Sequence, residues 1–130
     1  EAPALCTAEM YDPEDGAWSR LPDMPCRRLG PEPVVLGGRA YLCGGDSSRA
    51  EGTSAVDCFS LTSCSWEAAD PMTEARCGHL VVEVGGKIYV CGGMGPANQL
   101  LRSTERFDPK VGRWEGMPDM AGAGLCPGGV

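Results

Sequence analysis

The sequence has little of what metal and redox sites are built from. It contains one histidine, His79, and none of its eight cysteines forms a Cys-x-x-Cys pair. Zinc sites need four nitrogen or sulfur ligands at short spacings. The acidic residues are scattered rather than paired for general acid–base chemistry. We therefore expect no metal, no cofactor and no catalytic centre.

Positive charge and long apolar runs are also scarce. Eleven Lys and Arg stand against 18 Asp and Glu, for a net charge of −7, and such a field repels nucleic acid. No apolar run approaches 18 residues, so we expect no membrane partner. Cysteines without a pairing pattern are typical of buried thiols in a reducing compartment. We predict a cytoplasmic protein with free thiols, in which Cys58 and Cys64, flanking a tight turn, are the one plausible disulfide.

Glycine and proline, by contrast, fill 30 of the 130 positions, which argues against long helices. The chain also repeats with a period of 48 residues. Without any gap, residues 24–71 and 72–119 are identical at 13 of 48 positions. The recurring positions are large apolar residues and glycine doublets: Trp18, Trp66 and Trp114; Met24, Met72 and Met120; Tyr11, Phe59 and Phe107; Gly37-Gly38 and Gly85-Gly86. Such a period indicates a repeat architecture, in which each unit buries its apolar face against a neighbour.

Each unit has the pattern of four short strands. The apolar runs 33–36 with 39–43, and 79–84 with 87–91, are joined by Gly-Gly turns, which predicts hairpins of inner strands covered on both faces. The later runs, such as 103–107 and 113–115, carry one large aromatic each and are expected to be outer strands. The turn 60–64 lacks the Pro and Gly of its counterparts, so we expect it to be the least well specified.

No helix pattern follows the doublets Gly44-Gly45 and Gly92-Gly93, which favours close backbone packing over phosphate binding.

These residues resemble the kelch repeat. A glycine doublet ends the segments Tyr41-Leu42-Cys43-Gly44-Gly45 and Tyr89-Val90-Cys91-Gly92-Gly93, and Phe107-Asp108-Pro109 precedes Trp114 at seven residues from the Phe. The resemblance implies an all-β fold: a fragment of a kelch-type β-propeller, with four-stranded antiparallel blades and too few of them to close. It implies the outer hairpin of a partial blade in 1–23, kelch repeats in 24–71 and 72–119, and the degenerate start of a further blade or a tail in 120–130.

The resemblance also implies a function, since propellers of this family are protein-binding modules. The chain is similar to the kelch domains of BTB-kelch proteins, which present substrates to cullin-RING ubiquitin ligases through a BTB domain. An actin-binding or other cytoskeletal scaffold is the alternative. A galactose-oxidase-like enzyme is a remote alternative, because its copper site uses histidines and tyrosines together and this chain has one histidine. We expect a protein or peptide partner.

The residues expected to bind that partner lie at one rim of the blades. Two loops, 46–53 and 94–100, differ between the units and supply Asp46, Ser47, Ser48, Arg49, Asn98 and Gln99. Arg28 and Arg76 each follow a unit-starting Met by four residues, and their planar guanidinium groups are suited to the carboxylates of an acidic peptide. The alternative is that each arginine caps local carbonyls or pairs with a nearby acid such as Asp23 or Asp70.

Overall fold

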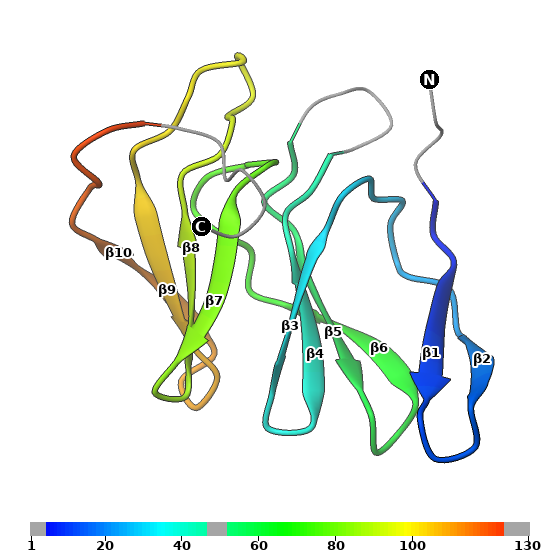
Figure 1. Cartoon of the computed structure of the whole chain (residues 1–130). Coiled ribbons are helices and arrows are strands. Elements are labelled where there is room, and N and C mark those ends of the chain that lie inside the picture. The colour runs from blue at the N-terminus through cyan, green and yellow to red at the C-terminus, as the bar shows by residue number, and fades with distance from the viewer. Residues whose placement is uncertain (1–4, 47–51, 124–130) are drawn as a thin grey trace.

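The computed structural model describes residues 5–46 and 52–123, which form ten strands in three antiparallel sheets (Figure 1). The strands are β1 (Ala8–Asp12), β2 (Ala17–Leu21), β3 (Glu32–Leu36), β4 (Arg39–Cys43), β5 (Val56–Ser60), β6 (Ser65–Ala69), β7 (Leu80–Val84), β8 (Lys87–Cys91), β9 (Thr104–Asp108) and β10 (Arg113–Met117). Strands β3–β6 form the first blade and β7–β10 the second, each in sequence order, while β1 and β2 form a separate outer hairpin. The predicted all-β architecture of unclosed four-stranded blades is confirmed.

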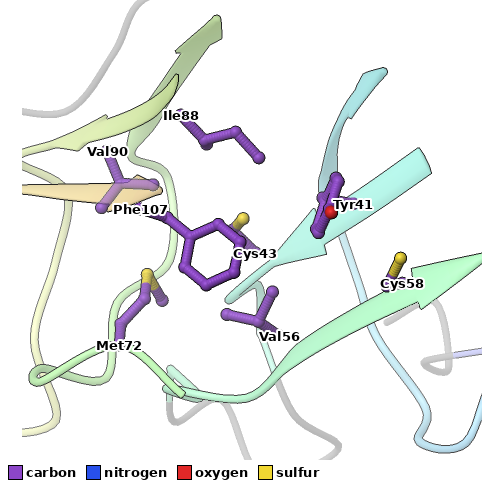
Figure 2. Packing of buried hydrophobic residues seen from close by; sticks show 8 residues of the cluster. All are labelled: Tyr41, Cys43, Val56, Cys58, Met72, Ile88, Val90 and Phe107. Atoms are coloured by element: carbon purple, nitrogen blue, oxygen red, sulfur yellow. The ribbon is translucent and has the colours of Figure 1, made fainter. Parts of the chain in front are cut away.

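The two blades pack against each other through one apolar core. Its side chains come from β4 and β5 of the first blade, from β8 and β9 of the second, and from the connection between the blades; they are Tyr41, Cys43, Val56, Cys58, Met72, Ile88, Val90 and Phe107. Figure 2 shows Phe107 in the middle of this core, and its ring centroid lies 5.7 Å from that of Tyr41. Each blade therefore buries its apolar face against a neighbour, as the repeat predicts.

Burial is distributed differently from the expectation of doubly covered inner strands. All five residues of β5 are buried, whereas Val35 on β3 and Val84 on β7 are exposed. The first strand of each blade, β3 or β7, lies at the edge of its sheet, and these two strands contact each other. The middle strands have a paired strand on each side and a neighbouring sheet against one face, so they carry most of the core.

The recurring aromatic residues pair across the outer two strands of each unit. Their registers place Tyr11 opposite Trp18, Phe59 opposite Trp66 and Phe107 opposite Trp114, with ring centroids 5.2, 5.0 and 5.2 Å apart. Tilted aromatic pairs at such distances stabilise a sheet beyond simple burial.

Two of the tryptophans also join one unit to the preceding one. The indole Nε1 of Trp66 donates a 2.7 Å hydrogen bond to the carbonyl oxygen of Pro22, and Trp114 donates an equal bond to the carbonyl oxygen of Asp70. In both bonds the acceptor lies 44 residues before the tryptophan in the sequence. The recurrence of tryptophan therefore serves contacts between units as well as packing within them.

The turn at 60–64 has the same backbone shape as its counterparts despite its different sequence. Cys64 occupies the left-handed region, with φ of 54°, where Gly16 and Gly112 have φ of 68° and 75°. Its backbone N–H donates to the carbonyl oxygen of Ser60 at 2.9 Å, as that of Gly16 does to Asp12. A side chain is thus held in a conformation that favours glycine.

Candidate functional site

A continuous series of backbone bridges links the three units along the upper edge of the sheets in Figure 1. We call it the rim ladder; it consists of Leu5 with Arg28, Leu29 with Asp46, Asp46 with Gly52, Thr53 with Arg76, Cys77 with Met94, and Met94 with Leu100. The bridges fall where the loops between the second and third strands begin and end. The roots of both loops are therefore held by neighbouring backbone.

Arg28 closes the base of the loop that joins β4 to β5. Its Nη1 donates to the carbonyl oxygen of Gly44 at one end of the loop and, at 3.1 Å, to that of Ala55 at the other end. Its Nη2 forms a 2.5 Å ion pair with Asp57, and the Arg28 side chain is buried. One guanidinium group thus fixes the two ends of a loop to each other.

Arg76 has the same arrangement in the second blade. Its Nη1 donates to the carbonyl oxygens of Gly92, at 2.7 Å, and Ser103, at 3.1 Å, and its Nη2 pairs with Glu105 at 2.9 Å. The other oxygen of Glu105 accepts a 2.7 Å bond from the backbone N–H of Thr73. The second loop is therefore closed by its arginine and tied to the connection that precedes the blade.

This geometry corresponds to the second alternative considered for the arginines. Each caps local carbonyls and pairs with an acid, and neither guanidinium lies at the surface. The acids are Asp57 and Glu105 rather than the predicted Asp23 or Asp70. The signal that identifies them is in the sequence, because an acidic residue follows each arginine by 29 positions in both repeats.

The tip of the second loop is a compact turn that leaves its side chains exposed. The backbone N–H of Gly95 donates to the carbonyl oxygen of Gln99 at 2.9 Å, and that of Asn98 donates to Gly95 at 3.0 Å. The side-chain oxygen of Gln99 accepts from the backbone N–H of Ala97, also at 2.9 Å. Asn98 has φ of 57° and is exposed, as is Leu100. The tip is therefore ordered from within, and Asn98 stands at its surface.

The first loop is described only at its roots. Asp46 belongs to the rim ladder and is partly buried, and its Oδ1 is buried without a hydrogen-bond partner among the described residues. The predicted residues Ser47, Ser48 and Arg49 lie outside the described residues. The structure thus places Arg28, Arg76 and Asp46 at the loop bases, and Asn98 and Gln99 at a loop tip.

His79 is a buried contact between the blades that the sequence did not single out as a site. Its Nε2 lies 2.9 Å from the carbonyl oxygen of Cys43 in the first blade. Burial lowers the pKa of His79 to about 4, and the neighbouring positive charge of Arg76 acts in the same direction. The ring is therefore neutral at physiological pH and donates through Nε2.

The glycine doublets permit this close approach, as predicted. A Cβ on Gly44 would lie 2.6 Å from the carbonyl oxygen of Arg76 and 2.7 Å from Cε1 of His79. A Cβ on Gly93 would lie 2.7 Å from the carbonyl oxygen of Cys77. At Gly44 backbone of the next unit, and at Gly93 backbone of the same unit, therefore occupies the space that a side chain would need.

The seven described cysteines are free thiols. Cys58 is buried on β5 opposite Glu67, and Cys64 lies in the turn that follows. Burial raises the pKa of Cys43 to about 12, so that this thiol stays protonated at neutral pH.

Within residues 5–46 and 52–123 there is no group of three or more His, Cys, Asp or Glu placed to hold a metal ion. The same part of the chain has no helix long and apolar enough to cross a membrane.

A family model described as the kelch motif matches residues 2–25, 27–73 and 75–121. The chain therefore belongs to the kelch-motif family. Among curated proteins it is 34% identical over 122 residues to Kelch-like protein 38 of Rattus norvegicus, and equally so to that of Mus musculus. It is 31% identical over 121 residues to Kelch-like protein 38 of Homo sapiens. Each match covers 91% of this chain and 21% of the relative, so the chain spans about a fifth of the length of these relatives.

A solved structure, "Structure of YjhT", shares the fold. It superimposes with a TM-score of 0.75 over 92% of this chain and 52% of the other, at 15% sequence identity. The similarity to Kelch-like protein 38, a BTB-kelch protein, is distant but covers almost the whole chain. The recognition of a kelch-repeat module of the kind found in BTB-kelch proteins is thereby confirmed.

Proposed function

We propose that this chain is a protein-binding module, and that the loops above the rim ladder contact the partner. One observation carries the proposal: in both blades a buried arginine closes the base of the loop between the second and third strands. The loop tips differ in sequence while their roots share one geometry. Variable loops on rigid roots are typical of binding surfaces on repeat scaffolds.

The exposed tip 96–100 is the best-described part of this surface. Asn98 presents an amide that both donates and accepts hydrogen bonds, and Leu100 presents apolar surface beside it. Arg28 and Arg76 act as positioning residues in this proposal, because their charges are already balanced by Asp57 and Glu105. The described residues therefore leave the charge of the partner open, and an acidic peptide is one class to test.

The finer proposal is that the protein carrying this chain is a BTB-kelch adaptor that presents substrates to a cullin-RING ubiquitin ligase. Its support is the similarity to Kelch-like protein 38. The proposal includes a cytoplasmic location, which the free thiols support. It also includes a non-catalytic role, which is supported by the scattered arrangement of acidic residues and the single histidine in the sequence.

Affinity purification from cells, with the protein at its natural length as bait, tests both the binding role of the rim loops and the adaptor role. The rim variant combines Asn98→Gly, which keeps the left-handed backbone, with Leu100→Ser. The matched control is Lys110→Ala, an exposed change in the hairpin turn at the opposite edge of the second blade. We expect the rim variant to lose specific partners that the control retains, while both keep the wild-type melting temperature.

Three results would contradict these proposals. Identical partner sets for wild type and rim variant would refute the rim as the binding surface. Recovery of partners without any cullin would refute the adaptor role while leaving the binding role intact. Co-sedimentation with filamentous actin that survives in the rim variant would favour a cytoskeletal scaffold instead.

A further inference from the structure

The rim ladder has two faces that differ in chemistry. Residues opposite each other across an antiparallel bridge carry their side chains to the same side, and neighbours along an extended chain carry them to opposite sides. Thr53 and Arg76 are opposite each other in one bridge, and their chain neighbours Gly52 and Cys77 belong to the adjoining bridges. The buried arginine therefore occupies one face of the ladder, and Gly52 and Cys77 belong to the other.

We call this second face the outer rim face. The bridges place six residues on it, in the order in which they follow one another along the rim: Leu29, Asp46, Gly52, Cys77, Met94 and Leu100. Leu29 and Leu100 are exposed, and the side chains of Asp46, Cys77 and Met94 are half-buried. The outer rim face is thus an accessible, mostly apolar surface that carries one carboxylate.

Asp46 has no cationic partner among the described residues. None of their ion pairs includes it, and its Oδ1 is buried without a hydrogen bond from them. Gly52, which lies opposite Asp46 in the bridge, has no side chain that could shield the carboxylate. A partly buried charge is less well hydrated than an exposed one, so an arriving cation gains more from pairing with it.

The neighbours of Asp46 in the second unit are neutral. Met94 takes the position of Asp46 there, 48 residues later, and its backbone N–H donates to the carbonyl oxygen of Cys77 at 2.8 Å. Burial raises the pKa of Cys77, and the negative charge of Asp46 raises it further, so this thiol stays protonated at neutral pH. Three steps of the ladder separate Asp46 from Met94, which is about 14 Å at the usual spacing of roughly 4.8 Å between strands.

We propose that the outer rim face binds a partner segment that carries a lysine or arginine for Asp46 and a large apolar residue for Met94 and Leu100. An extended segment covers about 14 Å in roughly four residues, so the two anchors stand about four positions apart. Methionine adapts its shape to different apolar groups, which suits the second anchor. This partner chemistry rests on the proposed binding role of the rim. The arginines leave the charge of the partner open, whereas the carboxylate on the outer rim face favours a basic one.

Selection from a library of random peptides displayed on phage tests the proposal, with the 130-residue chain as bait under reducing conditions. We expect enrichment of peptides in which a lysine or arginine stands about four positions from a leucine, isoleucine or phenylalanine. One selected peptide is then compared by calorimetry with a version that carries glutamate at the basic position. This charge reversal should weaken binding roughly tenfold or more.

Variants of the chain locate the contact. Asp46→Asn keeps the shape of the side chain and removes its charge, so it should weaken binding of the basic peptide roughly tenfold at an unchanged melting temperature. Asp46→Lys should reverse the preference, so that the glutamate peptide binds more tightly than the basic one. Leu100→Ser should weaken binding through the apolar anchor. The matched control is Glu14→Gln, which removes an equal charge from the exposed turn between β1 and β2 at the opposite edge of the sheets and should bind as the wild type does.

Several results would overturn the proposal. Selection of acidic or uncharged peptides, or of none, would refute the basic partner. Equal weakening by Asp46→Asn and Glu14→Gln would show that the net charge of −7 attracts basic peptides without a specific contact. Unchanged binding in both Asp46→Asn and Leu100→Ser would place the contact elsewhere. In each case the affinity purification with the rim variant still decides whether the rim binds a partner, so the two proposals can fail separately.

Discussion

Acidification should destabilise the fold through His79. The side chain is buried between the blades, and its pKa is about 4 in the folded protein against 6.5 for an ordinary histidine. A group with a lower pKa in the folded state binds its proton more tightly when the chain is unfolded. Stability is therefore unaffected above pH 6.5, falls as the pH drops from 6.5 towards 4, and levels off below the folded pKa.

The size of this effect follows from the two pKa values. One unit of pKa difference corresponds to about 1.4 kcal/mol, so the difference between 6.5 and about 4 gives a limit of roughly 3 kcal/mol. At pH 5 the loss should be about 2 kcal/mol. That is a large fraction of the free energy of unfolding of a small domain, about 5–15 kcal/mol.

The measurement is urea unfolding at pH 7.5 and pH 5 for the wild type and for His79→Gln. The glutamine amide keeps a donor for the carbonyl oxygen of Cys43 and does not titrate. All other ionisable groups are the same in both proteins, so their contribution cancels in the comparison. We expect the wild type to lose about 2 kcal/mol more than the variant between the two pH values. An equal loss in both proteins would refute the assignment of a neutral, buried histidine.

Three further predictions concern stability. Cys64→Gly should raise the free energy of unfolding by roughly 1 kcal/mol, because it relieves a left-handed residue that carries a side chain; an unchanged or lower urea midpoint would contradict this. Trp66→Ala should lower the free energy of unfolding by about 3 kcal/mol, whereas Trp18→Ala, at a side chain 66% exposed, should lower it by less than about 1 kcal/mol. Equal losses of stability in thermal melts of the two variants would count against the contact between units. Arg76→Ala should lower the free energy of unfolding by about 3–5 kcal/mol because it leaves Glu105 buried without its partner, and adding Glu105→Gln should recover part of that stability. A double-mutant cycle that finds no coupling between the two positions would argue against the ion pair.

The blades were predictable from the sequence because their determinants recur. Aromatic residues seven apart, such as Phe107 and Trp114, set the register of the outer strands, and the doublets such as Gly92-Gly93 end the second strand of each unit. The kind of fold and the positions of most strands follow from these repeats alone. What did not follow is the depth at which each strand is buried, because this depends on which sheet faces are covered by a neighbour.

The role of the arginines was harder to predict for a related reason. Arg28 and Asp57 are 29 residues apart, and no local pattern brings them together. Their contact requires that the connection before a blade pass beneath the loop that follows β4. The sequence alone therefore left two roles open for the arginines, partner binding or local capping, whereas the tertiary arrangement places them beneath the loops.

The indole contacts described above give the repeat a direction. Trp66 and Trp114 each donate to the carbonyl of the unit before, so every unit offers a donor towards one end of the chain and an acceptor towards the other. Because both bonds run in the same sense, each unit is fixed to the unit before it through a donor of its own and an acceptor of its neighbour. Exchanging the order of two units would therefore bring the indole of each against the wrong neighbour, so the order of the units along the chain is built into these contacts.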